Sequence, residues 1–172
     1  MNLKRTNQTK AAITAVGGYV PDTILSNEDL EKMVDTNDAW ITSRTGIKER
    51  RILKDQDKPT SFLAIKAAQD LISKHDINAK SIDLVIVATI TPDMFVAATA
   101  AYVASSIGAH NAFAYDLNAA CSGFLYGMST SAAYITSGRY KKVLLIGADK
   151  MSSIVDYTDR TTTTLLDFIL QR

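Results

Sequence analysis

Three short apolar runs, separated by helix-length segments, constrain the fold of this 172-residue chain more than any other feature. The first run, Asp83–Ile90, is almost entirely apolar, as expected of a strand that is covered on both faces. Two more runs follow at Ala112–Leu117 and Lys142–Ala148, and helical segments at Ala97–Ile107 and Ser122–Ser137 lie between the runs. This β-α-β-α-β order predicts an α/β fold: a predominantly parallel sheet with helices on both faces.

The segment before these runs is predicted to add two strands and three helices. In chain order they are a strand at Ala12–Val16, a helix capped by Ser26, a helix at Asn37–Arg44, a short strand at Ile47–Ile52 and a helix at Thr60–Ser73. Asp29 stands three residues after Ser26, as in a capping box. Glycines at positions 46, 108 and 138 are placed to end the helices that precede them.

Composition excludes several classes of protein. Nineteen basic against eighteen acidic residues give a net charge of +1, which does not suggest a nucleic-acid-binding protein. The first ten residues lack the apolar core of a signal peptide, and no apolar run approaches the roughly 20 residues of a membrane helix. The single cysteine excludes an intrachain disulfide and a CxxC metal site. We therefore expect a soluble, cytoplasmic protein that binds no metal, nucleic acid or membrane.

The cysteine, Cys121, falls between a predicted strand and the helix that follows it. Ligands of parallel sheets gather at this edge, and the positive end of a helix dipole stabilises a thiolate. The alternative is a buried, inert cysteine. Of the two histidines, His110 precedes the same strand and so should lie roughly 20 Å from the thiol. His75 and His110 are both more simply surface or capping residues, so the sequence offers a nucleophile without a base.

Two other groups of residues are candidates for binding. Trp40 and Arg44 are four residues apart and would share one face of a helix, where they could stack on a base and meet phosphate. The simpler alternative is a half-buried tryptophan beside a surface arginine. The polar turn Asp156–Thr161 follows the last predicted strand, at the same sheet edge as Cys121. By pattern alone such a turn is more often a loop than a site.

Taken together, these segments resemble ketoacyl-ACP synthase III, the initiating condensing enzyme of type II fatty-acid synthesis. The resemblance covers about Ala11 to Thr162 and includes Ala-Ala-Cys-Ser-Gly-Phe around Cys121. The other matching segments, in family order, are Gly17–Pro21, Asn27–Asp35, Trp40–Arg50 and Asp159–Thr161.

The resemblance implies a thiolase-like fold, built in the family from two similar halves of one chain, and a homodimer. It also implies an acyltransferase. Cys121 would take an acyl group, typically from acetyl-CoA. Malonyl-ACP would then lose CO2 and attack the thioester to give a 3-ketoacyl-ACP. Acyl-CoA and acyl carrier protein would be the partners, with no cofactor. The backbone N–H of Cys121 would help to form an oxyanion hole.

The resemblance also assigns binding residues. Trp40 and Arg160 match the residues that sandwich the adenine of CoA, and Thr36 and Arg44 match their neighbours in that site. Phe95 matches the residue that crosses the dimer interface to line the partner's acyl pocket, although Val96 stands where the family usually has proline.

The chain departs from the family after Thr162. The histidine and asparagine that assist decarboxylation belong to the second half of the family's chain, and neither histidine here occupies that place. We therefore expect a polar tail at 1–10, an amino-terminal thiolase-like half at 11–162 and an aberrant, truncated tail at 163–172. We also expect that the chain alone cannot complete condensation. A non-catalytic CoA- or partner-binding fragment, or another acyltransferase of the thiolase superfamily, remains an alternative.

Overall fold

The computed structural model describes residues 10–159, 162 and 163, which form two compact units. The sheet unit takes in residues 10–19 and 60–148, and the hairpin unit takes in 20–59 and the described residues after 148. Each unit is described by itself. The predicted division at residues 10 and 162 stays a prediction, and the predicted tails lie almost wholly outside the described residues.

The sheet unit is built on three parallel strands. They are β3 (Leu84–Ala88), β4 (Phe113–Leu117) and β5 (Val143–Gly147), in the order β4-β3-β5. Leu84 pairs with Phe113 and with Val143, which sets the register on both sides of the central strand. All five residues of β3 are buried, as its apolar sequence predicts for a strand with a neighbour on each side and a helix on each face.

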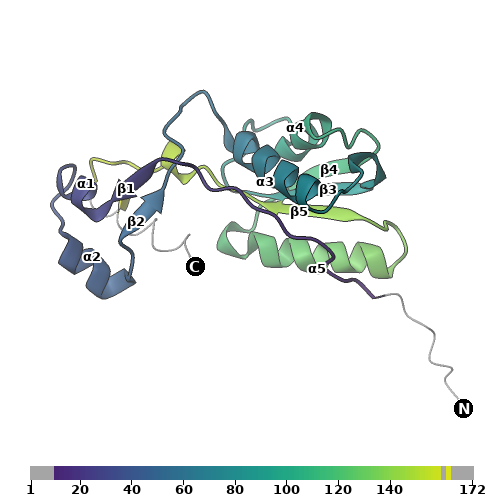
Figure 1. Ribbon diagram of the computed structural model, residues 1–172, viewed down its shortest axis with the longest axis horizontal. Helices are drawn as coiled ribbons and strands as arrows, with labels where there is room; N and C mark the ends of the chain where they lie inside the picture. The colour runs from purple at the N-terminus through teal and green to yellow at the C-terminus, as the bar shows by residue number, and fades with distance from the viewer. Residues whose placement is uncertain (1–9, 160–161, 164–172) are drawn as a thin grey trace, which may run out of the picture. The chain divides into compact units, whose positions relative to one another are not determined.

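Helices cover both faces of this sheet, which confirms the predicted α/β architecture. Figure 1 shows α3 (Thr60–Lys74) and α4 (Thr99–Ser106) on one face and α5 (Gly123–Thr136) on the other. The larger core joins alanines of α3 and α4 to alternate residues of β3 and β5, namely Val85, Val87, Leu144 and Ile146. On the opposite face, a Cβ on Gly127 of α5 would collide with a methyl of Leu145, so this glycine lets α5 approach β5 closely.

The prediction of a strand at Ala12–Val16 is wrong. This segment forms no strand, and Ile13 and Val16 are 74% and 69% exposed. It is held instead against the end of α3, where the Gly18 N–H donates to Asp70 at 3.0 Å and the Val16 carbonyl lies 3.0 Å from Nε2 of His75. Alternating apolar residues form a strand only beside a neighbouring strand, and the described part of the chain supplies none there.

The hairpin unit pairs β1 (Ile24–Ser26) with β2 (Glu49–Arg51) in antiparallel fashion and adds α1 (Asn27–Glu31) and α2 (Asp38–Thr45). The predicted strand at Ile47–Ile52 contains β2, whereas β1 was not predicted. The two helices begin within a residue of their predicted positions. Gly46 ends α2 with φ of 74°, the left-handed conformation that glycine adopts most easily. A small core of Leu25, Leu30 and Ile41 joins the strands to the helices.

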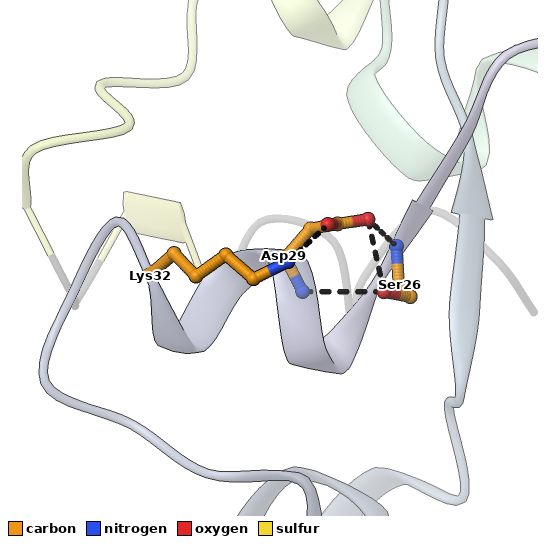
Figure 2. A network of polar contacts seen from close by, with 3 residues as sticks. All are labelled: Ser26, Asp29 and Lys32. Atoms are coloured by element: carbon orange, nitrogen blue, oxygen red, sulfur yellow. Dashed lines mark hydrogen bonds and ion pairs between the residues drawn. The ribbon is translucent and has the colours of Figure 1, made fainter.

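The predicted capping box at the start of α1 is present (Figure 2). The Ser26 side chain accepts a hydrogen bond from the Asp29 N–H at 3.2 Å, and the Asp29 carboxylate accepts one from the Ser26 N–H at 3.2 Å. Lys32 also donates to Asp29 at 3.1 Å. The bond from Lys32, and then those from Ser26, hold the pKa of Asp29 below its ordinary value.

Ser26→Ala removes the hydroxyl that accepts the hydrogen bond from the Asp29 N–H in this capping box. We expect the free energy of unfolding of the hairpin unit to fall by about 1 kcal/mol, the usual contribution of an N-cap hydroxyl. Trp40 is the only tryptophan of the chain and lies in α2, so its fluorescence during urea denaturation measures this unit. Ser26→Asp supplies another capping oxygen and should restore most of the loss. An unchanged midpoint in Ser26→Ala would contradict the role of the cap.

A carboxylate at the amino-terminal edge of the sheet predicts a pH dependence of stability. One oxygen of Asp83 accepts hydrogen bonds from the N–H groups of Lys141 and Lys142, at 2.8 and 3.0 Å, and these bonds lower its pKa below 3.8. Because the folded state favours the ionised carboxylate, Asp83 stabilises the fold. This contribution is fully present above the ordinary pKa of 3.8 and is lost as the pH falls through the lower pKa of the folded state. Urea titrations between pH 6 and 2.5 should show a smaller acid loss in Asp83→Asn than in the wild type.

Candidate functional site

Cys121 lies where the sequence predicts, between a strand and a helix of the sheet unit. It follows β4 within a short 3-10 helix, η2 (Ala120–Ser122), and α5 begins two residues later at Gly123. The thiol is exposed, so the alternative of a buried, inert cysteine does not hold for this structure. The position places Cys121 beyond the carboxyl end of β4 and shortly before the first residue of α5.

The backbone before Cys121 is strained. Ala120 adopts a φ of 45°, in the left-handed region that residues with a Cβ rarely occupy. The turn is closed by hydrogen bonds from the Ser122 N–H to the Ala119 carbonyl and from the Gly123 N–H to the Ala120 carbonyl. A strained residue at a sharp turn of this kind costs about 1–3 kcal/mol and is typical of functional sites, where it fixes the direction of a neighbouring side chain.

The backbone amide of Cys121 fits a role in binding an anion. Within the described part of the chain, the structure gives this N–H no hydrogen-bond acceptor. A backbone amide at a helix start that has no acceptor of its own can donate to an oxygen that gains negative charge during acyl transfer. The thiol and a candidate oxyanion donor therefore belong to the same residue.

Neither histidine of the chain assists Cys121. His110 lies before β4, so the whole length of that strand separates it from the thiol, as the sequence predicts. His75 follows α3 and contacts the Val16 carbonyl through Nε2. No group of three or more histidine, cysteine, aspartate or glutamate residues in the described ranges could hold a metal ion.

Phe95 lies in the same unit, in the connection between β3 and α4. Its side chain is 103% exposed, and Val96 beside it is 100% exposed. The structure therefore presents Phe95 at the surface of its own chain, as a residue that inserts into a partner would require. Its role at a dimer interface stays a prediction.

Trp40 and Arg44 meet on α2 of the hairpin unit. The Arg44 guanidinium carbon lies 4.4 Å from the centroid of the indole, within cation–π distance. Asn37 caps the helix by accepting the Trp40 N–H at 2.8 Å, and Trp40 packs on the core of the unit while Arg44 is exposed. The two side chains therefore share one face of α2, as their spacing predicts. A half-buried tryptophan beside an exposed arginine also fits the simpler alternative, so the role of the pair in binding stays a prediction.

Thr36 lies one residue before the cap of α2. Its hydroxyl oxygen is buried and has no hydrogen-bond partner among the described residues. A buried hydroxyl without a partner is uncommon, and a bound ligand is one explanation for it. Arg160, the other residue predicted for this site, lies outside the described residues.

A buried polar network beneath α2 was not predicted. Asn27, 1% exposed, accepts a hydrogen bond from the Arg50 guanidinium, which is itself 2% exposed. Its amide donates to Asp38 at 2.7 Å and to the Ile47 carbonyl at 2.8 Å. Hydrogen bonds from Asn27 and then Thr42 lower the pKa of Asp38. Asn27 thus ties α1, α2 and β2 together beneath the helix that carries Trp40. No spacing in the sequence marks it, because its partners are 11 to 23 positions away.

Comparison with known proteins shows which family the cysteine segment resembles. Residues 115–167, which include Cys121, match the family model described as 3-oxoacyl-[acyl-carrier-protein (ACP)] synthase III. The chain is 61% identical over 156 residues to the β-ketoacyl-[acyl-carrier-protein] synthase III of Chlorobium chlorochromatii. It is 58% identical over 152 residues to β-ketoacyl-[acyl-carrier-protein] synthase III 2 of Bacteroides thetaiotaomicron. These matches confirm the resemblance that the sequence motifs predict.

The relatives are longer than this chain. The matches cover 91% and 88% of this chain but 47% and 45% of the two relatives, so the chain spans about half the length of the curated relatives it matches. In the described residues, no helix is both long and apolar enough to cross a membrane.

Solved structures confirm the fold. The structure of 3-oxoacyl-[acyl-carrier-protein] synthase III from Aquifex aeolicus superposes with a TM-score of 0.85 at 44% identity, covering 91% of this chain and 50% of that one. The priming β-ketosynthase of the R1128 polyketide pathway superposes with a TM-score of 0.87 at 30% identity, covering 96% of this chain and 49% of that one. The chain therefore has the thiolase-like α/β fold, over about half of each of those proteins.

Proposed function

We propose that this chain carries the acyl-loading cysteine of a β-ketoacyl-ACP synthase III, the family to which its sequence is similar over nine tenths of its length. The full reaction would convert acyl-CoA and malonyl-ACP into 3-ketoacyl-ACP, CO2 and CoA. The observation that carries the proposal is the exposed thiol of Cys121 at the start of α5, inside the segment that matches the family model.

In the loading step, the Cys121 thiolate attacks the thioester carbonyl of acyl-CoA. A new S–C bond forms, and the carbonyl oxygen gains negative charge that the N–H of Cys121 stabilises. The intermediate then collapses, the bond to the CoA sulfur breaks, and CoA leaves as a thiolate. The proton lost from the Cys121 thiol passes through solvent to CoA, so the step needs no cofactor.

The hairpin unit supplies the nucleotide-binding residues in this proposal. Trp40 would stack on the adenine, and Arg44 would place its charge near the phosphates of CoA. The buried hydroxyl of Thr36 would find its missing hydrogen-bond partner on the nucleotide. Arg160 would complete the site from the other face of the adenine, as the resemblance implies.

We expect the 172 residues by themselves to stop at the acyl-enzyme. Decarboxylation of malonyl-ACP requires general acid–base or hydrogen-bonding groups beside the cysteine, and neither His75 nor His110 lies there. Acyl carrier protein remains the proposed partner for the second step. A cytoplasmic homodimer, in which Phe95 reaches the partner's acyl pocket, completes the proposal. Its support is the exposed apolar surface of this loop and of α5.

Incubation of the purified chain with acetyl-CoA labelled in the acetyl group tests the proposal. We expect protein-bound label that is released by hydroxylamine, as a thioester is, and no ketoacyl product when malonyl-ACP is added. Binding of CoA without any transfer of label would favour the non-catalytic alternative instead. Labelling at a residue other than Cys121 would contradict the assignment of the nucleophile.

A further inference from the structure

The connection between β3 and α4 ends in an exposed apolar tip, formed by Met94, Phe95 and Val96. Their exposed fractions are 61%, 103% and 100%. Three successive apolar side chains in water are unfavourable, so a tip of this kind is suited to insertion into another surface. Such a tip can enter another surface in a fixed position only if both ends of the connection that carries it are held in place.

Asp116 of β4 holds the downstream end of this connection. One carboxylate oxygen accepts a hydrogen bond from the Thr99 N–H and the other accepts one from the Ala100 N–H, both at 2.7 Å. These are the first two amides of α4, and the residue at the N-cap position, Ala98, makes no side-chain cap. The carboxylate of Asp116, on the neighbouring strand β4, therefore caps α4 with both of its oxygens in place of the missing N-cap side chain.

Asp93 holds the upstream end. Its carboxylate accepts the Ser61 N–H at the start of α3 at 2.9 Å, and its own N–H donates to the Thr99 hydroxyl at 3.1 Å. The Thr60 hydroxyl donates to the Thr91 carbonyl at 2.6 Å. The tip is thus exposed, while the two ends of the connection that carries it are hydrogen-bonded to α3, α4 and β4.

The same strand leads to the thiol, since Cys121 follows Asp116 by five residues. We propose that Asp116 is a positioning residue that holds the exposed apolar tip in place on β4, and thereby sets which acyl chains are accepted in the acyl pocket of the partner subunit, which the tip would enter in the proposed homodimer. This rests on the proposed function. Its physical basis is that a tip lining an acyl pocket limits the depth of the pocket, and displacements near 1 Å are enough to change how an acyl chain is bound.

Asp116→Asn tests the role, with Asp83→Asn as a matched control. Both oxygens of Asp116 accept backbone N–H groups. In Asp116→Asn one of these oxygens is replaced by an NH2 group, which then faces the N–H of Thr99 or Ala100 and cannot accept its hydrogen bond. Asp83 also accepts two backbone N–H groups, but through one oxygen and at the opposite end of the same sheet, so Asp83→Asn controls for the loss of a carboxylate charge away from the tip. The measurement is the ratio of initial rates at which labelled acetyl-CoA and octanoyl-CoA acylate Cys121. We expect Asp116→Asn to change this ratio by about fivefold or more and Asp83→Asn to leave it at the wild-type value.

Two further variants keep the test informative if Asp116→Asn does not fold. Asp93→Ala removes one hydrogen bond to Ser61 and should change the ratio in the same direction. Asp93→Asn retains one acceptor oxygen for the Ser61 N–H, so its ratio of rates should be close to the wild-type value. Amide hydrogen exchange at residues 94–98 should become about tenfold faster in Asp116→Asn and stay unchanged in Asp83→Asn.

The outcomes separate the two proposals. If Cys121 is acylated but the ratio is the same in wild type, Asp116→Asn and Asp93→Ala, the positioning role is overturned and the proposed function stands. If Asp83→Asn changes the ratio as much as Asp116→Asn, the effect is one of general stability and the positioning role is again overturned. If no acyl-CoA labels the wild type, the proposed function fails, and the positioning role fails with it.

Discussion

Cys121→Ser should lower the rate of acyl transfer from acetyl-CoA to the chain by more than about a hundredfold. A serine hydroxyl is far less acidic than a thiol and, without a base beside it, is a much weaker nucleophile. The structure shows no histidine beside this position that could act as a base in its place. The effect should therefore fall on the chemical step, and the proposed binding of CoA by Trp40 and Arg44 should be unchanged.

Ser122→Ala is the matched control for this substitution. Ser122 is adjacent in the same 3-10 helix, and its side chain makes no capping hydrogen bond to α5. We expect it to be labelled at nearly the wild-type rate. Mass spectrometry of peptic peptides should locate the acetyl group on the peptide that contains Cys121. Equal labelling of wild type and Cys121→Ser would show that the nucleophile has been assigned to the wrong residue.

The sheet unit shows which parts of the fold a sequence can predict. β3, β4 and β5 are local apolar runs, and the glycines after α4 and α5 end those helices with φ of 82° and 75°. Each signal lies within a few residues of the element that it predicts, so periodicity and turn chemistry are sufficient. The position of Cys121 follows directly, because a residue between a parallel strand and its crossover helix must lie at the carboxyl edge of the sheet.

The features that were missed depend on residues distant in the sequence. Residues 12–16 have the alternation of a strand, but a strand requires a neighbour, and no local pattern reports that the segment lies instead against the end of α3. The sequence does not indicate the positive φ of Ala120, because alanine, unlike glycine, asparagine or aspartate, is not enriched in that conformation. The strain at this position comes from the turn that joins β4 to α5, and only the three-dimensional structure reveals it.

Among the candidate binding residues of the hairpin unit and the residues that support them, some could likewise be predicted from the sequence and others could not. The pairing of Trp40 with Arg44 follows from their spacing of four on one helix. The support beneath that helix does not, because Asn27 and Arg50 come from different elements and meet only after β1 and β2 pair. Sequence motifs therefore identify the residues that would touch a ligand more readily than those that hold them in place.

Asn27→Ala should be the most damaging single substitution in the hairpin unit. It removes one acceptor of the buried guanidinium of Arg50 and one donor to Asp38, and thus two hydrogen bonds that involve charged groups. A hydrogen bond to a charged group contributes about 1.5–3 kcal/mol, and truncating a buried partner costs more than the bond contributes. We expect the free energy of unfolding to fall by about 3 kcal/mol, against about 1 kcal/mol for the adjacent Ser26→Ala.

Trp40 fluorescence measures this loss directly, because the helix that carries the tryptophan is the one that Asn27 supports. Urea denaturation followed at this single tryptophan should give a midpoint for Asn27→Ala well below that of Ser26→Ala. Binding of CoA, titrated by quenching of the same fluorescence, should weaken in Asn27→Ala under conditions where the unit is still folded, because α2 then lacks its link to β2. A midpoint equal to that of Ser26→Ala would show that the Asn27 network contributes no more than an ordinary helix cap. Undiminished affinity for CoA would show that α2 is positioned by its apolar core alone.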